Sequence, residues 1–252
     1  MMDTISDLYL EMNRLIEAGR RQDLQLRAFG GLAIFTHSQD NMRFFRRDSP
    51  DVDFVVPREQ RHKLEAFFEA MGYSPDKQFN LLNGLRRQIY HQENSDRRID
   101  ILVGDFEMCH KLPLEDHRLD MDPVTIPLAE LLLSKAQIVQ LNRKDAMDIL
   151  SLLLNNELGM EGEGKIGRDR VAQLCAQDWG LYKTVTINLE RVEELLYTDE
   201  IKLPVDEQEL ILSRIRQIRD AIEAAPKSLA WQLRDKVGTR LRWYEEVEEV
   251  DR

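Results

Sequence analysis

Asp51-Val52-Asp53-Phe54-Val55-Val56 is the stretch from which the fold can be predicted. Its first four residues alternate a carboxylate with an apolar side chain, which is the two-residue period of a β-strand. Residues i and i+2 of a strand point to the same face, so we expect Asp51 and Asp53 to project together. Acidic residues occupy 46 of the 252 positions, so roughly one such match arises by chance. The motif therefore needs support from neighbouring segments.

Two neighbouring segments supply that support. Leu26–Phe29 is a short apolar stretch that runs into Gly30-Gly31, and the apolar residues after the glycines predict a helix. A third carboxylate, Asp100, is flanked by isoleucines in the strand-like segment 98–103. The alternative interpretation is that these acids form only the solvated face of half-buried strands.

The combination of residue types favours phosphate chemistry. Two carboxylates one strand repeat apart, Asp51 and Asp53, are suitable ligands for Mg²⁺, and Asp100 would complete a two-metal site. A glycine pair between a strand and a helix lets backbone N–H groups approach a phosphate.

The rest of the first half predicts an α+β domain over residues 1–127. Helices are expected over 4–19 and from Pro57 to about Met71, each ended by a glycine. Asn83-Gly84 predicts a β-hairpin between strands at 79–82 and 85–91.

The second half, residues 128–252, predicts a helical domain with a glycine-containing linker near 160–167. Its expected helices span 128–141, 143–154, 168–178, 185–197, 206–224 and 227–248. The expected fold class is therefore α+β, with a mixed sheet flanked by helices and then a helical domain.

Composition limits the class of protein. The formal charge is −11, from 35 basic and 46 acidic side chains, which argues against nonspecific coating of nucleic acid. No apolar run approaches the roughly 20 residues of a membrane helix, and the first residues lack a signal pattern. Cys109 and Cys175 are too few for a disulfide framework or a zinc ribbon. We expect a soluble, cytoplasmic protein with no membrane partner.

The negative charge belongs mainly to the second half of the chain. Residues 1–100 hold 15 basic and 16 acidic side chains, a net charge of −1, whereas residues 101–252 hold 20 and 30, a net charge of −10. Thirteen of the 15 basic residues in the first part are arginine, whose fork suits phosphate oxygens. Those near the predicted site include Arg43, Arg46, Arg47, Arg86, Arg87, Arg97 and Arg98.

Residues 25–155 resemble the DNA-polymerase-beta-like nucleotidyltransferase superfamily, and most closely the AbiEii/AbiGii toxin-like minimal bacterial nucleotidyltransferases. The glycine motif of that family is similar to Gly30-Gly31-Leu32-Ala33-Ile34, and its acidic motif to Arg47-Asp48-Ser49-Pro50-Asp51-Val52-Asp53. A later helix with a lysine and aspartates is similar to Lys135 followed by Arg143-Lys144-Asp145-Ala146-Met147-Asp148.

The resemblance implies transfer of a nucleoside monophosphate from a nucleoside triphosphate to an acceptor hydroxyl, with two Mg²⁺ (or Mn²⁺) ions and release of pyrophosphate. Asp51, Asp53 and Asp100 would be the catalytic metal ligands. The residues implied to contact the nucleotide are Gly30, Gly31, Arg47, Ser49 and Lys135. The acceptor could be a small molecule, a tRNA end or a protein, and a toxin–antitoxin partner is one possibility that the resemblance raises.

Two departures from the family pattern leave alternatives open. Leu32 follows the glycines where many members carry a hydroxyl beside the second glycine, and the interval from Gly31 to Asp51 is longer than usual. One alternative is a catalytically silent member that binds a nucleotide or a partner protein. Another is a structural or antitoxin-like protein, in which the three acids would not converge.

Overall fold

The structure is a computed structural model, and it describes residues 4–42, 44, 51–93, 95, 97–114, 116–160 and 164–246. The chain divides into two compact units. The N-terminal unit comprises Met1–Gln39, Phe45–Phe106 and Pro113–Pro127, and the C-terminal unit comprises Asp40–Phe44, Glu107–Leu112 and Leu128–Arg252. Within the described ranges, no helix combines the length and the apolar character that a bilayer crossing needs.

The N-terminal unit is built on a mixed five-stranded sheet with the order β1-β2-β5-β4-β3. Its strands are β1 (Arg27–Phe29), β2 (Val52–Val56), β3 (Tyr73–Pro75), β4 (Arg87–Gln92) and β5 (Arg98–Val103). The β2–β5 pair is parallel, whereas the other pairs are antiparallel. With its flanking helices, this sheet confirms the predicted α+β class.

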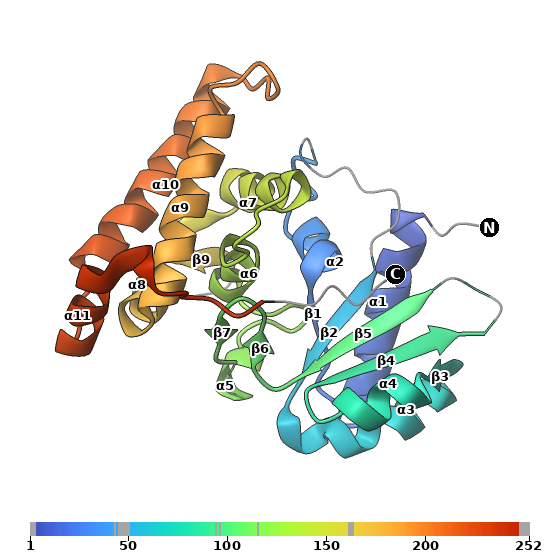
Figure 1. Ribbon diagram of the computed structural model, residues 1–252. Helices are drawn as coiled ribbons and strands as arrows, with labels where there is room; N and C mark the ends of the chain where they lie inside the picture. Colours follow the sequence, from blue (N-terminus) through green and yellow to red (C-terminus); the bar gives the residue numbers. More distant parts are fainter. Residues whose placement is uncertain are drawn as a thin grey trace. The chain divides into compact units, whose positions relative to one another are not determined.

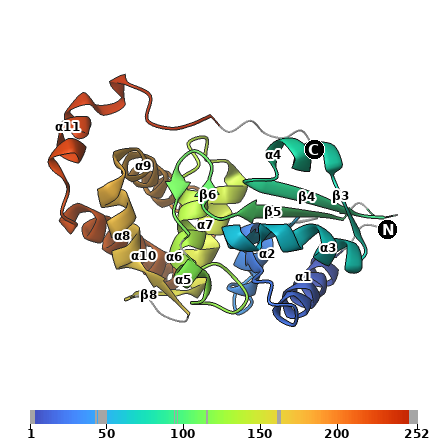
Figure 2. The ribbon, with the colours of Figure 1, turned by 90° about the horizontal axis from the view of Figure 1, so that it is seen from below.

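Helices flank the sheet, and two of them cover one of its faces (Figures 1 and 2). The helical elements of this unit are α1 (Ile5–Arg20), α2 (Gly30–Thr36), the 3-10 helix η1 (Arg58–Lys63), α3 (Leu64–Ala70), α4 (Lys77–Asn83) and α5 (Asp116–Leu119). Figures 1 and 2 show α1 and α3 on the same side of β4 and β5. Phe54 and Ile101 are fully buried in the sheet, and Phe68 of α3 stacks on Tyr90 of β4 with ring centroids 4.6 Å apart.

One predicted strand is a helix. Residues 79–82 lie within α4, and Asn83-Gly84 ends that helix instead of turning a hairpin. The cause is local, because the Asp76 carboxylate caps the helix by accepting from the Phe79 N–H at 3.0 Å. The Asn80 carboxamide also bonds the backbone of Ile89, accepting from its N–H at 2.7 Å and donating to its C=O at 3.1 Å. The hairpin prediction was therefore wrong, and the short strand β3 was not predicted.

The outer strand β1 bonds a segment that is not a strand. Ala28 donates its N–H to the Val124 carbonyl at 2.8 Å, and its own carbonyl accepts from the Ile126 N–H at 3.0 Å.

The C-terminal unit is mainly helical. Its longer elements are α6 (Leu128–Ala136), α7 (Arg143–Asn155), α8 (Arg168–Gln177), α9 (Trp179–Leu195), α10 (Val205–Ala224) and α11 (Leu229–Val237). The shorter elements are β6 (Phe106–Glu107, shared with the N-terminal unit), β7 (Lys111–Leu112), β8 (Glu157–Gly159), β9 (Lys165–Gly167) and the 3-10 helix η2 (Gly238–Arg240).

The buried side chains of α10 follow the spacing predicted from the sequence. Ile211, Ile215, Ile218 and Ile222 are the buried residues of α10, as expected for one face of an amphipathic helix. Helix α11 ends at Val237, earlier than the predicted 248, because Gly238 takes a positive φ of 62°. Strands β8 and β9 form a parallel pair beside the glycine-containing stretch.

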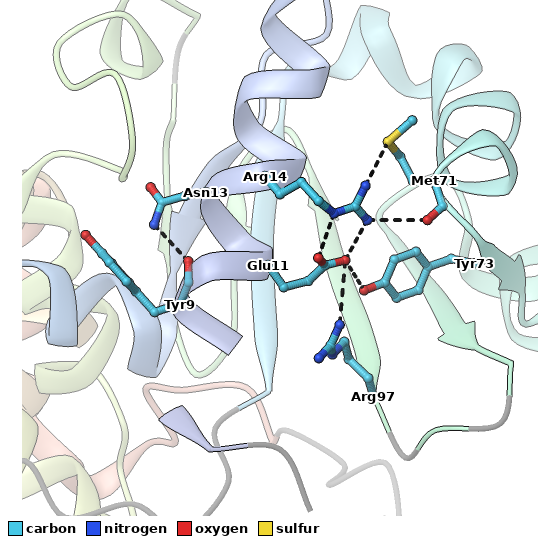
Figure 3. A network of polar contacts seen from close by, with 7 residues as sticks. All are labelled: Tyr9, Glu11, Asn13, Arg14, Met71, Tyr73 and Arg97. Atoms are coloured by element: carbon cyan, nitrogen blue, oxygen red, sulfur yellow. Dashed lines mark hydrogen bonds and ion pairs between the residues drawn. The ribbon is translucent and has the colours of Figure 1, made fainter. Parts of the chain in front are cut away.

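A closed polar network joins α1 to β3 in the N-terminal unit (Figure 3). The Glu11 carboxylate accepts two hydrogen bonds from Arg14, both at 2.7 Å, and one from the Tyr73 hydroxyl at 2.6 Å. Arg97 lies 3.8 Å from the same carboxylate. Burial opposes ionisation of Glu11, but the hydrogen bonds from Arg14 and Tyr73 outweigh it and lower the pKa.

We expect Tyr73→Phe to lower the free energy of unfolding by about 2 kcal/mol at pH 7, because a charged acceptor loses a buried donor. The lowered pKa of Glu11 means that its contribution is present above the unfolded-state pKa and is lost as pH falls through the folded-state pKa. The difference between wild type and variant should therefore shrink on acidification, as measured by urea unfolding at pH 7 and below pH 4.

Tyr9→Phe is the matched control for this measurement. Tyr9 lies on the same helix and packs edge-to-face on Phe35, and its hydroxyl has no hydrogen bond among the described residues. An equal loss of stability in the two variants would contradict the role of the Glu11 bond.

Candidate functional site

Two of the three predicted carboxylates lie side by side in the sheet. Asp53 of β2 is the register partner of Asp100 of β5. Register partners on neighbouring strands share a face of the sheet, so both side chains project from the face opposite to buried Phe54 and Ile101. Asp51 immediately precedes β2 and is exposed. The two-residue alternation of the strand, which was predicted from the sequence, therefore explains why the carboxylates project away from Phe54 and Ile101.

Gly30 lies directly against the Asp53 carboxylate. Its backbone has φ +66°, and a Cβ at this position would be 2.3 Å from Oδ2 of Asp53. Phe29, the last residue of β1, is the register partner of Asp53, which explains why the turn into α2 meets this carboxylate. Gly31 is the next residue of α2 and is buried. Only a residue without a side chain can occupy position 30 in this arrangement.

Asp100 is bound by two arginines. Arg87 donates through Nε to Oδ1 at 2.8 Å and through Nη2 to Oδ2, a two-point contact. Arg98 donates through Nη2 to Oδ2 at 3.0 Å. Asp100 is only 4% exposed, so these guanidinium groups compensate a buried charge.

All three predicted acids act electrostatically on Arg87. The hydrogen bonds to Asp100 are the largest cause of a raised Arg87 pKa, and burial opposes them. The charge of Asp100, followed by those of Asp53 and Asp51, raises this pKa further. Asp53 and Asp100 are register neighbours, and the charges of all three acids reach the Arg87 guanidinium.

The carboxylates fit a magnesium ion in chemistry but not in their present arrangement. Oxygen donors are what Mg²⁺ prefers. In the part of the chain that the structure describes, however, no group of three or more His, Cys, Asp or Glu side chains is arranged to hold a metal ion. Both oxygens of Asp100 are already bound by the guanidinium groups of Arg87 and Arg98.

The other predicted nucleotide contacts lie elsewhere. Arg47 and Ser49 are outside the described residues. Lys135, at the end of α6 in the C-terminal unit, forms ion pairs with Asp145 at 2.9 Å and Asp148 at 3.0 Å. All three of these side chains are largely buried. A structural role thus accounts for Lys135 within its own unit, and its contact with a nucleotide remains a prediction.

Three of the arginines singled out for phosphate have carboxylate partners, whereas Arg43, Arg46 and Arg47 lie outside the described residues. Arg87 and Arg98 bind Asp100, and Arg97 pairs with Glu11. Sequence reasoning also missed Phe79, whose ring centroid lies 5.7 Å from Cζ of Arg87. The helix-capping pattern that begins at Asp76 was the signal that would have placed Phe79 on a helix beside β4.

Gly30→Ala tests the contact between the glycine and the Asp53 carboxylate. We expect it to lower the free energy of unfolding by about 3 kcal/mol, from a strained backbone and an overpacked carboxylate. Gly72→Ala is the control, since Gly72 has φ +90° and nothing within 4 Å of its added Cβ. It should cost only about 1 kcal/mol in the same urea titration. Equal losses would show that the close approach at Asp53 has no energetic effect.

Lys135→Met should destabilise the protein by about 3 kcal/mol, because it leaves two buried aspartates without their ammonium partner. Lys165→Met removes an exposed pair with Glu157 at 3.5 Å and should cost less than about 1 kcal/mol. Thermal and urea unfolding of both variants would compare them. A Lys135→Met protein as stable as Lys165→Met would contradict the structural role.

No protein-family model matches the chain, and no curated protein matches it. Among solved structures it is similar to an antigenic nucleotidyltransferase-like protein from Paracoccidioides brasiliensis, with a TM-score of 0.38 and 17% identity. That similarity covers 71% of this chain and 92% of the other. The closer resemblance to AbiEii/AbiGii toxin-like proteins therefore remains a prediction.

Proposed function

We propose that the protein is a nucleotidyltransferase that moves a nucleoside monophosphate from a nucleoside triphosphate to an acceptor hydroxyl. The observation that carries this proposal is the parallel register of Asp53 with Asp100, with Gly30 closely packed against Asp53. Carboxylates on adjacent strands, beside a glycine turn into a helix, are the arrangement that the motif resemblance implies for this chemistry.

In the proposed reaction the acceptor oxygen attacks the α-phosphorus, and the bond from that phosphorus to the oxygen bridging the β-phosphate breaks. The products are the nucleotidylated acceptor and pyrophosphate, and the acceptor proton passes to a carboxylate or to water. Mg²⁺ or Mn²⁺, which the resemblance implies, would supply charge neutralisation and activation of the acceptor hydroxyl when bound.

The chain's own residues would then have distinct roles. Asp53 is the proposed central carboxylate, because it contacts the glycine turn and neighbours Asp100. Asp100 could take a proton only after its oxygens leave the guanidinium groups that hold them. Gly30 and Gly31 are the proposed backbone contacts for phosphate oxygens, as the resemblance of the glycine motif implies.

The remaining contacts are proposed from the resemblance alone. They are Asp51 as a further carboxylate, and Arg47, Ser49 and Lys135 as contacts for the triphosphate. The acceptor class stays open between a small molecule, a tRNA end and a protein, and so does membership of a toxin–antitoxin pair.

A second candidate function is binding without catalysis. The ion pairs of Asp100 with Arg87 and Arg98 favour it, because they occupy a carboxylate that catalysis would use. Such a protein would bind a nucleotide or a partner at the same face of the sheet and release no pyrophosphate.

Transfer of label from α-³²P-labelled nucleoside triphosphates, with Mg²⁺ or Mn²⁺ and a panel of acceptors, tests the first proposal. We expect Asp53→Asn to abolish transfer, because the amide carries no charge. Asp23→Asn is the control, since Asp23 is exposed and has a φ of 51° that asparagine tolerates. Transfer by Asp53→Asn at the wild-type rate would contradict the proposal.

Thermal unfolding separates the two candidate functions. A nucleotide that binds the folded protein must raise the melting temperature as its concentration rises. Stabilisation by a triphosphate without label transfer would favour the binding protein. If none of the four nucleotides at millimolar concentration shifted the melting temperature, the transferase and a nucleotide-binding protein would both be excluded, and only binding of a partner would stand.

A further inference from the structure

Helix α11 carries a stripe of apolar side chains on its solvent side. Leu229, Leu233 and Val237 are four residues apart, so they lie above one another on the same face of the helix. Their exposed fractions are 78%, 62% and 36%, and Leu241, four residues further along the chain, is 62% exposed. A single exposed leucine is ordinary on a protein surface, whereas a continuous row of them is typical of a binding surface.

The opposite side of α11 attaches the helix to its unit. Trp231 is buried and donates from Nε1 to the Cys175 carbonyl at 3.1 Å. Asp235 accepts from Nε1 of Trp179 at 2.7 Å, and the Ser228 hydroxyl caps the first turn by accepting from the Trp231 N–H at 3.2 Å. The leucine stripe is therefore not needed for this attachment, and the helix is already formed for a partner.

The charges beside this stripe are positive. Residues 227–242 hold five basic side chains and one acidic side chain, Asp235. Three of the bases are engaged with backbone carbonyls or with a carboxylate, namely Lys227, Arg234 and Arg242. The other two, Lys236 and Arg240, are exposed and have no hydrogen bond or ion pair with any residue that the structure describes. Lys236 is three residues after Leu233, so a cation borders the stripe directly.

This surface fits an acidic amphipathic helix better than it fits a bilayer or a second copy of the chain. An anionic bilayer faces the whole unit, and the net charge of −10 on residues 101–252 opposes it. Two copies of α11 packed on each other would bring their cations together, and the one acid of the segment is already bonded to Trp179. A single helix with apolar and acidic side chains contacts α11 alone and complements both its leucines and its cations.

We propose that the solvent side of α11 is a docking surface for an acidic amphipathic helix of a partner protein. Leu229, Leu233 and Val237 contact the apolar side chains of that helix, and Lys236 and Arg240 pair with its carboxylates. Because α11 has nine residues and is about 14 Å long, the interface is small and the complex is transient. This inference concerns the C-terminal unit and does not depend on the proposed transfer reaction.

Fluorescence anisotropy of two labelled synthetic peptides, titrated with the full chain, tests the proposal. Both peptides have about 15 residues with leucine at helical spacing, and the remaining positions are glutamate in one and lysine in the other. We expect the glutamate peptide to bind with a Kd of about 10–100 μM and the lysine peptide at least about tenfold more weakly. Equal binding of the two peptides, or binding of neither, would overturn the proposal.

Substitutions locate the binding on α11. Leu233→Gln should weaken binding of the glutamate peptide at least about fivefold without lowering the melting temperature, because the side chain is exposed. Leu81→Gln is the matched control, since it removes an 86% exposed leucine of α4. Lys236→Gln should weaken binding about threefold and reduce its salt dependence, whereas Lys202→Gln, at another exposed lysine, should change neither. Equal effects of the two leucine variants, or of the two lysine variants, would contradict the assignment to α11.

Two further measurements identify the other occupants. The full chain should stay in solution when vesicles of about three parts phosphatidylcholine to one part phosphatidylglycerol are sedimented. Sedimentation equilibrium should show the same mass for wild type and Leu233→Gln. Vesicle binding that Leu233→Gln abolishes would overturn the proposal in favour of a lipid surface, and self-association that it abolishes would do so in favour of a second copy.

Discussion

The parallel pairing of β2 with β5 is the constraint on which the N-terminal unit depends. Parallel strands cannot be joined by a tight turn, so the chain crosses over through α3, β3, α4 and β4 before β5 begins. The same register buries Phe54 beside Ile101 and sets Asp53 beside Asp100. A slip of one residue would turn the acids into the core, so packing of the core also fixes the candidate site.

The candidate site and the polar network around Glu11 both pair a buried carboxylate with arginines, at different places in the fold. Glu11 is one carboxylate with two arginines and a tyrosine hydroxyl, so its charge is fully compensated within the fold. Asp100 is held by the guanidinium groups of Arg87 and Arg98, and its register partner Asp53 lies against Gly30. The network around Glu11 joins a helix to an outer strand, whereas the contacts of Asp100 lie on the face of the sheet that carries the candidate site.

Features that depend on a short segment of sequence could be predicted, whereas contacts between segments far apart in the sequence could not. The alternation at Asp51–Val56 and the glycines at 30 and 31 were sufficient to predict β2 and the turn into α2. The prediction of a hairpin at Asn83-Gly84 was wrong, because the same dipeptide is typical of a hairpin turn and of a helix end. In the structure, the helix cap at Asp76 favours the helix. The Arg87–Asp100 contact was beyond local reasoning, since it depends on the register between two strands.

The side-chain amide of Asn80 has a consequence for how this protein behaves in a crowded solution. Strand β4 extends beyond its three-residue neighbour β3, and there the Asn80 amide oxygen occupies the Ile89 N–H, which would otherwise be open to a strand from another molecule. The Ile89 C=O accepts from both the Asn80 amide and the Asp76 N–H. At the opposite side of the sheet, residues 124 and 126 occupy the corresponding groups of Ala28. The backbone groups of Ile89 and Ala28 are thus occupied without an additional strand, which protects these two positions against edge-to-edge pairing with another molecule.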